Sequence, residues 1–392
     1  MISKSAELGS LFEFIRNGMN IKQDKSGEGI PITRIETISE GEIDPLKVGY
    51  AGIEPNEAAR WLLKPGDILF SHINSVKHVG KCALYDGSLS PLIHGMNLLN
   101  LRPNKDKLDS TYGKWLLRSP AFRAKLMPFV NRAVNQASVS IGNLSAIAVQ
   151  VPAVSEQKRI AAILDQADSL RVLRQRAIDR LNSLGQAMFL EMFGDPRSNP
   201  KKYPIHRLGD VADVRDGTHD SPAYVDDGHP LLTSKNFTSG KLNIEGAKLI
   251  SEDDYKNINR RSKVDIGDIV MPMIGTIGSP VVIEEEPHFA IKNVALIKFG
   301  DSDLSAWYVN AILSGPYLQH HVAAKGRGGT QQFISLGDLR SLEIPVPPRD
   351  EQTRFAEQLN SLKFSRHGYE LASANLEKLF SSLQHRAFRG EL

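Results

Sequence analysis

The second half of this chain repeats the first half, and no other sequence feature constrains the fold as strongly. Residues 155–164 (SEQKRIAAIL) align with residues 350–359 (DEQTRFAEQL) at an offset of 195. Two further landmarks recur in the same order. Gly66-Asp67-Ile68 returns as Gly267-Asp268-Ile269, and Leu8-Gly9 returns as Leu208-Gly209. A period of this length is far longer than a solenoid unit, so it indicates duplication of a whole domain.

Each copy of the repeat ends in a long predicted helix, at residues 155–194 and at residues 350–392. Pro152 precedes the first helix, Ser155 is its expected N-cap, and Gly194 is its expected stop. Apolar residues recur along both helices at steps of three and four residues. Narrow apolar stripes on two such helices predict an antiparallel coiled coil. The alternative is that each helix packs only on its own domain.

The segments between the helices carry short apolar runs bounded by Gly, Pro, Asn and Asp, which are typical of strands. Each segment also carries one amphipathic helical stretch. This mixture predicts an α+β protein with two repeated mixed α/β domains that are separated by the two long helices. The predicted boundaries are 1–154 for the first domain, 155–194 for the first helix, 195–349 for the second domain and 350–392 for the second helix.

Composition and charge narrow the class of protein. The single cysteine, Cys82, excludes an internal disulfide framework, and the chain shows no signal peptide and no membrane-spanning apolar run. We therefore expect a soluble cytoplasmic protein without a membrane partner. The net charge is only +3, but residues 1–154 carry 18 Lys and Arg against 14 Asp and Glu, whereas residues 195–349 carry 18 against 20. Any basic surface is expected mainly in the first domain.

A basic segment runs from residue 102 to residue 132 and holds eight Lys and Arg residues against two Asp residues. Lysine and arginine neutralise DNA phosphates without reading sequence, so this segment is a candidate for backbone contact. A solvated helix face is the alternative. The residues proposed for DNA contact from this segment are Lys114, Arg118 and Lys125.

Two polar loops occupy equivalent places in the repeat. Residues 131–144 (NRAVNQASVSIGNL) align with residues 326–339 (GRGGTQQFISLGDL) at the offset of 195. Arginine binds phosphate or guanine and amide side chains read adenine, so both loops are candidates for DNA contact. A hydrogen-bonded turn that joins helix to sheet is the alternative. The candidates are Arg132, Asn135, Gln136 and Ser138 in the first copy and Lys325, Arg327, Thr330, Gln331 and Gln332 in the second.

The common motifs of catalysis are missing from the sequence. It has no GxGxxG fingerprint after a strand, no GxxxxGK[ST] phosphate loop and no carboxylate–lysine nuclease pattern. Its histidines form no ligand pair on one helix face, because His320 and His321 are adjacent and point about 100° apart. We therefore expect no catalytic residue, cofactor or metal in this chain and no enzymatic activity of the chain by itself.

Several repeated motifs together suggest a family. Two helix starts, VPAVSEQKRI at residues 151–160 and VPPRDEQTRF at residues 346–355, follow the two Gly-Asp-Ile triplets, and MFLEMFGDP at residues 188–196 closes the first long helix. In this order, and over its whole length, the chain resembles the specificity (S) subunit of Type I restriction–modification systems. The net acidic second domain departs from what a phosphate-binding domain would carry.

The resemblance implies a function. Each repeated domain would be a target recognition domain that reads one half of a split, asymmetric site in double-stranded DNA. The paired helices would act as a spacer and would dock two methyltransferase subunits, and through them restriction subunits. S-adenosylmethionine, ATP and magnesium would then be bound by the partner subunits. The residues expected to dock the partners are Phe189, Met192, Phe193 and Phe388. The alternative function is a helical adaptor whose two domains bind proteins.

Overall fold

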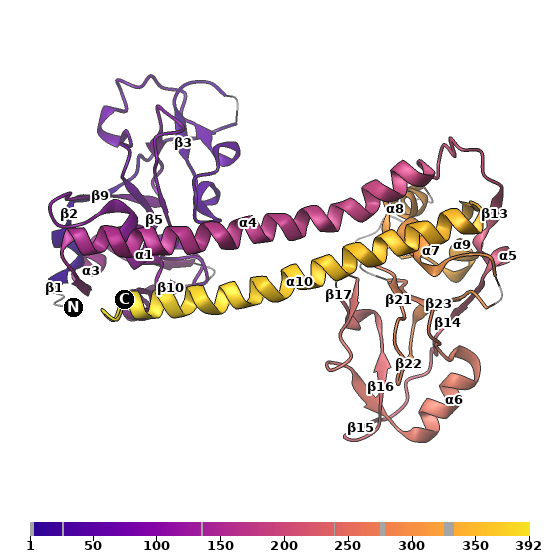
Figure 1. The fold of residues 1–392 in the computed structure, drawn as a ribbon. Helices are drawn as coiled ribbons and strands as arrows, with labels where there is room; N and C mark the ends of the chain where they lie inside the picture. Colours follow the sequence, from indigo (N-terminus) through magenta and orange to yellow (C-terminus); the bar gives the residue numbers. More distant parts are fainter. Residues whose placement is uncertain are drawn as a thin grey trace. The chain divides into compact units, whose positions relative to one another are not determined.

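The computed structural model describes residues 4–25, 27–134, 136–238, 240–274, 279–300, 302–324 and 333–392. The chain forms two compact units. Unit 1 comprises Met1–Gln175 and Leu371–Leu392, and unit 2 comprises Arg176–Glu370. Two long helices, α4 (Val154–Phe193) and α10 (Arg349–Ala387), each contribute one half to each unit (Figure 1). The prediction of two long helices is confirmed.

The core of unit 1 is a four-stranded antiparallel sheet with strand order β2-β9-β5-β7. Its strands are β2 (Phe12–Asn17), β9 (Leu98–Pro103), β5 (Ile68–Ser71) and β7 (Cys82–Leu84), and helices α1 (Ser110–Arg118) and α2 (Pro120–Leu126) pack beside them. A second sheet has the order β4-β3-β8, with β4 (Gly49–Tyr50), β3 (Pro31–Thr33) and β8 (Ile93–His94). A third, β1 (Lys4–Glu7) with β12 (Ala148–Val151), lies just before α4.

Unit 2 repeats this arrangement. Its four-stranded antiparallel sheet has the order β14-β23-β20-β21, from β14 (Asp213–Asp216), β23 (Val294–Lys298), β20 (Ile269–Pro272) and β21 (Val281–Val282). Helices α7 (Ala306–Ser314) and α8 (Pro316–Ala324) correspond to α1 and α2, and β13 (Ile205–Arg207) with β24 (Glu343–Pro345) corresponds to β1 with β12. The second sheet is β15 (Tyr224–Val225), β19 (Lys248–Ile250), β16 (His229–Leu232) and β22 (Ala290–Ile291), beside α6 (Glu252–Ser262). The predicted duplication of a mixed α/β domain is confirmed.

The repeated Gly-Asp-Ile triplet starts the central strand of each main sheet. Gly66 and Gly267 have φ values of +97° and +88°, a conformation that side chains with a Cβ rarely adopt. The buried Asp67 carboxylate accepts two hydrogen bonds from Arg102, at 2.7 and 2.6 Å, and one from Asn100. Asp268 pairs with Lys298 at the same place in unit 2. The triplet is therefore a turn whose buried acid is neutralised by the neighbouring strand.

Within each unit the two long helices pack against each other and against the domain. In unit 1, Ile160 and Leu164 of α4 share a buried cluster with Phe380 of α10 and with the main sheet. In unit 2, Phe189 of α4 lies against Phe355 of α10, with ring centroids 5.8 Å apart. The first half of one helix thus lies beside the second half of the other in both units. The pairing is antiparallel, as predicted, and packing on the domain accompanies it.

A buried glutamine attaches each long helix to its domain. In unit 1, Oε1 of Gln157 accepts a hydrogen bond from the Asp109 amide at 2.8 Å, and Nε2 donates to the carbonyls of Lys107 and Pro152 at 2.9 Å. In unit 2, Gln352 accepts from the Ser305 amide at 2.8 Å and donates to the Pro347 carbonyl at 2.8 Å. Both glutamines are fully buried, so each fixes the start of a long helix to the start of α1 or α7.

Replacing Gln157 by alanine should destabilise unit 1. The substitution leaves one amide and two carbonyls, in part-buried positions, without this partner, and such a loss costs about 1–3 kcal/mol of unfolding free energy. We expect a decrease of that order in denaturant unfolding monitored by circular dichroism. Gln166→Ala, at an exposed position of the same helix, is the matched control and should change little. Equal effects of the two substitutions would contradict the role of Gln157 in attaching α4 to the domain.

Candidate nucleic-acid interface

The first polar loop forms a short hairpin on the surface of unit 1. Strand β10 (Asn131–Ala133) pairs antiparallel with β11 (Gln136–Ser138), and β11 pairs with β6 (Ile73–Asn74). Arg132 and Gln136 are exposed, and Val134 near the tip is 92% exposed. Asn135, also expected to contact DNA, lies outside the described residues. The described part of the hairpin therefore presents polar groups and the apolar side chains of Ala133 and Val134 to solvent.

The register of the hairpin assigns its side chains to two faces. Asn131 is paired with Ser138 and Arg132 with Ala137. Paired residues share a face and consecutive residues alternate, so Asn131, Gln136 and Ser138 lie on one face and Arg132 lies on the other. Among the residues predicted to contact DNA, Gln136 and Ser138 therefore lie on the same face of the hairpin, and Arg132 lies on the opposite face.

Buried residues after the hairpin hold it in place. Ala137 and Val139 are each 1% exposed, and the Val139 amide donates a hydrogen bond to the His72 carbonyl at 3.0 Å. Ser140 then caps the short helix α3 (Ile141–Ser145), its hydroxyl accepting from the Asn143 amide at 3.1 Å. The serine that recurs in both loops is therefore a helix cap.

The second polar loop rejoins its unit through the same two kinds of contact as the first. Its candidates Lys325, Arg327, Thr330, Gln331 and Gln332 lie outside the described residues. After them, the Ile334 amide donates to the Met273 carbonyl at 2.9 Å, as Val139 does to His72. Ser335 caps α9 (Leu336–Arg340) through the Asp338 amide at 3.1 Å, as Ser140 caps α3. The two loops therefore rejoin their units at equivalent positions.

The basic residues predicted from the segment 102–132 are bonded within unit 1. Lys114 forms an ion pair with Asp165 of α4 at 2.8 Å and lies over the Trp115 ring. Arg118 donates to the carbonyls of Cys82 and Gly41, and the exposed Lys125 donates to the Ala148 carbonyl at 2.8 Å. Lys114 and Arg118 each tie a helix to another part of unit 1, and their contact with DNA stays a prediction.

Unit 2 offers a polar cluster that the sequence reasoning missed. His219 lies between Asp216 and Asn293, with ring nitrogens 2.7 Å from an oxygen of each, and these hydrogen bonds raise the pKa of His219. Lys292 donates to the Ser221 hydroxyl in the same region. Asn293 has a φ of +53°, which its short polar side chain tolerates. No spacing in the sequence links His219 to Asn293, which lies 74 residues further along the chain.

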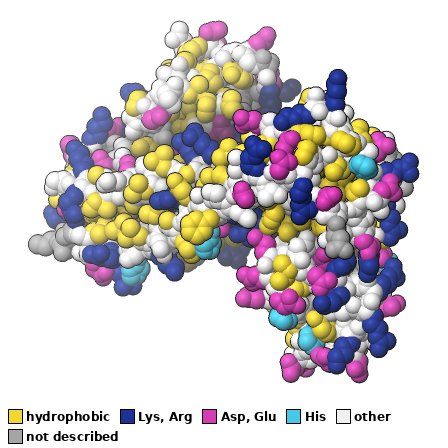
Figure 2. All heavy atoms as spheres, turned by 45° about the vertical axis from the view of Figure 1, so that its right-hand side comes forward, with side chains coloured by type: hydrophobic (Ala, Val, Ile, Leu, Met, Phe, Trp, Pro, Cys, Tyr) yellow, Lys and Arg dark blue, Asp and Glu magenta, His cyan; other side chains and the backbone are white. Residues whose placement is uncertain are grey.

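Neither a metal site nor a membrane span is found among the described residues. They contain no group of three or more His, Cys, Asp and Glu side chains that could hold a metal ion. None of the helices that the structure describes is both long enough and apolar enough to cross a membrane. On the face of unit 2 drawn in Figure 2, Lys and Arg side chains are interspersed with Asp and Glu side chains. This mixture agrees with the nearly balanced composition of the second repeat.

Comparison with known proteins decides the family. The family model described as "Type I restriction modification DNA specificity domain" matches residues 3–183 and again residues 200–365. The chain belongs to this family. The two matches coincide with the two copies of the repeat, so each copy carries one specificity domain.

Similar proteins agree with this assignment. The MjaX type I restriction enzyme specificity subunit of Methanocaldococcus jannaschii is 34% identical over 91% of this chain and 85% of its own length. The EcoKI specificity subunit of Escherichia coli is 29% identical over 49% of this chain and 42% of its own length. The crystal structure of the S subunit from M. genitalium superposes with a TM-score of 0.61 at 13% identity, covering 99% of this chain and 96% of that one. The last comparison shows the shared fold.

The structure buries two of the four side chains expected to dock partners and half-buries the other two. Phe189 and Phe193 are 1% and 3% exposed and stack on Tyr308 and Phe355 in the core of unit 2. Met192 is partly buried against the same cluster. Phe388 packs on Tyr112 in unit 1, with centroids 5.6 Å apart. Phe189 and Phe193 therefore join the second half of α4 to the core of unit 2, and Phe388 joins the end of the chain to unit 1.

Acid should weaken the anchor of the hairpin. Burial lowers the pKa of His72 to about 4, whereas the unfolded chain binds the proton near 6.5. The stabilising contribution of neutral His72 is therefore complete above pH 6.5 and is lost as the pH falls towards 4, with a slope of up to about 1.4 kcal/mol per pH unit. Unfolding of wild type and His72→Gln between pH 7 and 4 should show the shallower slope in the variant. His78→Gln is the matched control. If stability fell equally steeply with pH in wild type and in His72→Gln, the lowered pKa of His72 would be contradicted.

Proposed function

We propose that this specificity subunit reads a split DNA site, with each unit reading one half. The observation that supports the proposal most directly is the repeated frame of the polar loops. In both units a backbone hydrogen bond and a serine cap fix the point where the loop rejoins the domain. The loop sequences between these points differ, so the two half-sites should differ. Polar side chains on such loops suit contact with base edges and phosphates.

Methyltransferase and restriction subunits would supply the chemistry. We propose that two methyltransferase subunits dock on the paired helices, one at each unit, and that restriction subunits join through them. S-adenosylmethionine, ATP and magnesium would be bound by those partners, and this chain would have no catalytic activity by itself. The complex would act in the cytoplasm, where its DNA is. Membership of the specificity-domain family favours this function over an adaptor that binds only proteins.

The methylation pattern tests the split site. The DNA of cells that express this subunit with its methyltransferase should be methylated at a motif of two short, unlike half-sites flanking a fixed gap of unspecified bases. Single-molecule sequencing that detects methylated bases would reveal this motif. A continuous motif, or a palindromic one, would contradict the proposed reading of one half-site by each unit.

Hairpin variants test which side chains read the first half-site. Gln136→Ala should relax the preference at one base pair, and Arg132→Ala should weaken binding, each by roughly 1–3 kcal/mol. The affinity of the purified complex for its own site and for single-base variants would be measured over a range of salt concentrations. Arg159→Ala removes an exposed charge already paired with Glu156 and is the charge-matched control. Unchanged affinity and preference in both hairpin variants would remove the hairpin from the interface.

A further inference from the structure

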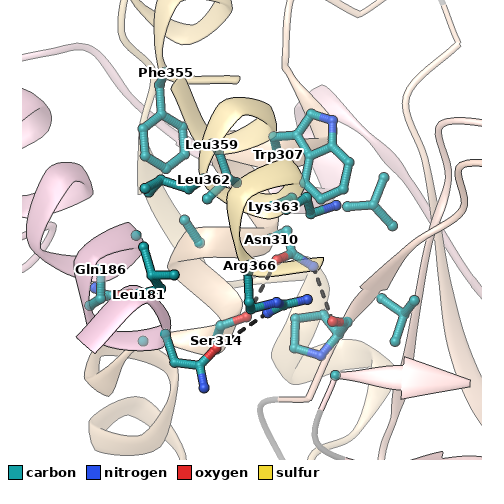
Figure 3. A pocket seen from close by; sticks show the side chains of 18 of the residues that line it. Leu181, Gln186, Trp307, Asn310, Ser314, Phe355, Leu359, Leu362, Lys363 and Arg366 are labelled. Atoms are coloured by element: carbon teal, nitrogen blue, oxygen red, sulfur yellow. Dashed lines mark hydrogen bonds between the residues drawn. The ribbon is translucent and has the colours of Figure 1, made fainter. Parts of the chain in front are cut away.

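Unit 2 contains a cavity of about 390 Å³ between its two helix halves and its domain. The floor is apolar, with Leu181 and Gly185 from α4 and Leu359 and Leu362 from α10. Trp307, Asn310 and Ser314 of α7 form the opposite wall, and Lys363 and Arg366 project from α10 beside them (Figure 3). The cavity is therefore an apolar pocket with two cationic groups and several amide and hydroxyl groups at its edge.

In unit 1 the equivalent space is filled by two aromatic side chains. Trp115 of α1 and Phe380 of α10 meet edge to face with ring centroids 5.4 Å apart, and both are buried. The Arg171 guanidinium lies 4.4 Å above the Phe380 ring and pairs with Asp168 at 2.7 Å and Glu377 at 2.8 Å. A cation, a ring and two carboxylates therefore complete the packing there.

The repeat identifies the matching positions in unit 2. Gln157 accepts from the Asp109 amide and Gln352 accepts from the Ser305 amide, so Asp109 and Ser305 are equivalent positions. This gives an offset of 196 along α1 and α7, and Trp115 therefore corresponds to Ala311. The long helices repeat at an offset of 195, so Phe380 corresponds to Gly185. The contact of Tyr112 with Phe388 supports this alignment, because Tyr308 contacts Phe193 in the same way. The cavity exists because alanine and glycine stand where unit 1 has tryptophan and phenylalanine.

Arg366 is the counterpart of Arg171 and is less well satisfied. Its Nε is 3.4 Å from Glu370 and makes no hydrogen bond although it is buried, and its Nη1 is 3.4 Å from the Asn182 oxygen. Asn182 stands where unit 1 has the carboxylate of Glu377. Lys363, in contrast, is neutralised by Glu284 at 2.7 Å and lies 3.4 Å from the centre of the Trp307 ring. Arg366 thus lacks both the ring and the close carboxylate that Arg171 has.

We propose that this cavity receives an aromatic side chain of a methyltransferase subunit, with a carboxylate of the same subunit pairing with Arg366. The proposal rests on the proposed docking of that subunit and names a contact for it in unit 2. A protein side chain is the occupant because a protein side chain, Phe380, fills the equivalent space in unit 1. Leu184 (42% exposed) and Phe364 (83% exposed) are apolar residues of the same helices that face solvent.

The proposal makes the two docking sites unequal. Unit 1 carries its own aromatic filling, so a methyltransferase bound there would have no such cavity to enter. Unit 2 would take the aromatic side chain from its partner. An aromatic anchor in a closely fitting pocket is typical of the residues that dominate the affinity of an interface.

A variant that transfers the filling of unit 1 into unit 2 tests the proposal. Gly185→Phe combined with Ala311→Trp would occupy the cavity, and a Cβ at Gly185 would meet only the end of the Leu359 side chain, at 3.2 Å. Gly368→Phe is the matched control, because its Cβ would meet nothing within 4 Å. Each chain would be purified with its methyltransferase subunit, weighed intact by native mass spectrometry and titrated with added methyltransferase. Arg366→Gln is a second variant that leaves the cavity empty.

Wild type and Gly368→Phe should carry two methyltransferase subunits per chain. The filled variant should retain one, with the affinity of the second weakened at least about tenfold, and Arg366→Gln should weaken it by about tenfold. Two subunits bound with unchanged affinity by the filled variant and by Arg366→Gln would overturn the proposal while leaving the proposed function intact. A small aromatic molecule released from wild type but not from the filled variant, with methyltransferase binding unchanged, would also overturn it. A wild-type chain that binds no methyltransferase would instead reject the proposed docking itself.

Discussion

The attachment of each long helix to its domain depends on one buried glutamine. A long amphipathic helix can rotate or slide along a sheet at little cost, because apolar contacts are not directional. Gln157 and Gln352 remove that freedom, since their amides join the first turn of the helix to backbone groups at the start of α1 and α7. The aromatic contacts and the cavity in unit 2 lie along the helices whose register these bonds fix.

The two copies of the domain share their backbone arrangement and differ in the side chains packed around it. The strand order of the main sheet, the Gly-Asp-Ile turn and the serine caps are the same in both units. The buried acid of that turn keeps a cationic partner in both, although Arg102 serves Asp67 and Lys298 serves Asp268. The two copies therefore keep the same type of side chain at the buried turn. In the layer between α1 or α7 and the long helices, in contrast, they differ as much as Trp115 and Ala311 do. This separation explains how one scaffold can hold two different recognition surfaces.

The sequence was sufficient for the architecture because repetition and helical periodicity are long-range signals. Residues 155–164 and 350–359 predicted the two helices, and the structure has them at Val154–Phe193 and Arg349–Ala387. Charge and apolarity were poorer guides to the site. Lys114 looked available for DNA, but its partner Asp165 is distant in sequence, and the stripe through Phe189 gave no sign of which side faces the domain. Such roles depend on tertiary partners that a local pattern does not contain.

The division of the long helices between units affects the order of folding during synthesis. Phe380 and Ala387 belong to the buried core of unit 1, yet they are translated after all of unit 2. The unit that emerges first from the ribosome is thus completed last, and until then it exposes the apolar surface that α10 will cover. Unit 2, in contrast, contains no residue beyond Glu370. A released chain that lacked residues 371–392 would therefore hold all of unit 2 but would leave unit 1 without its final helix half.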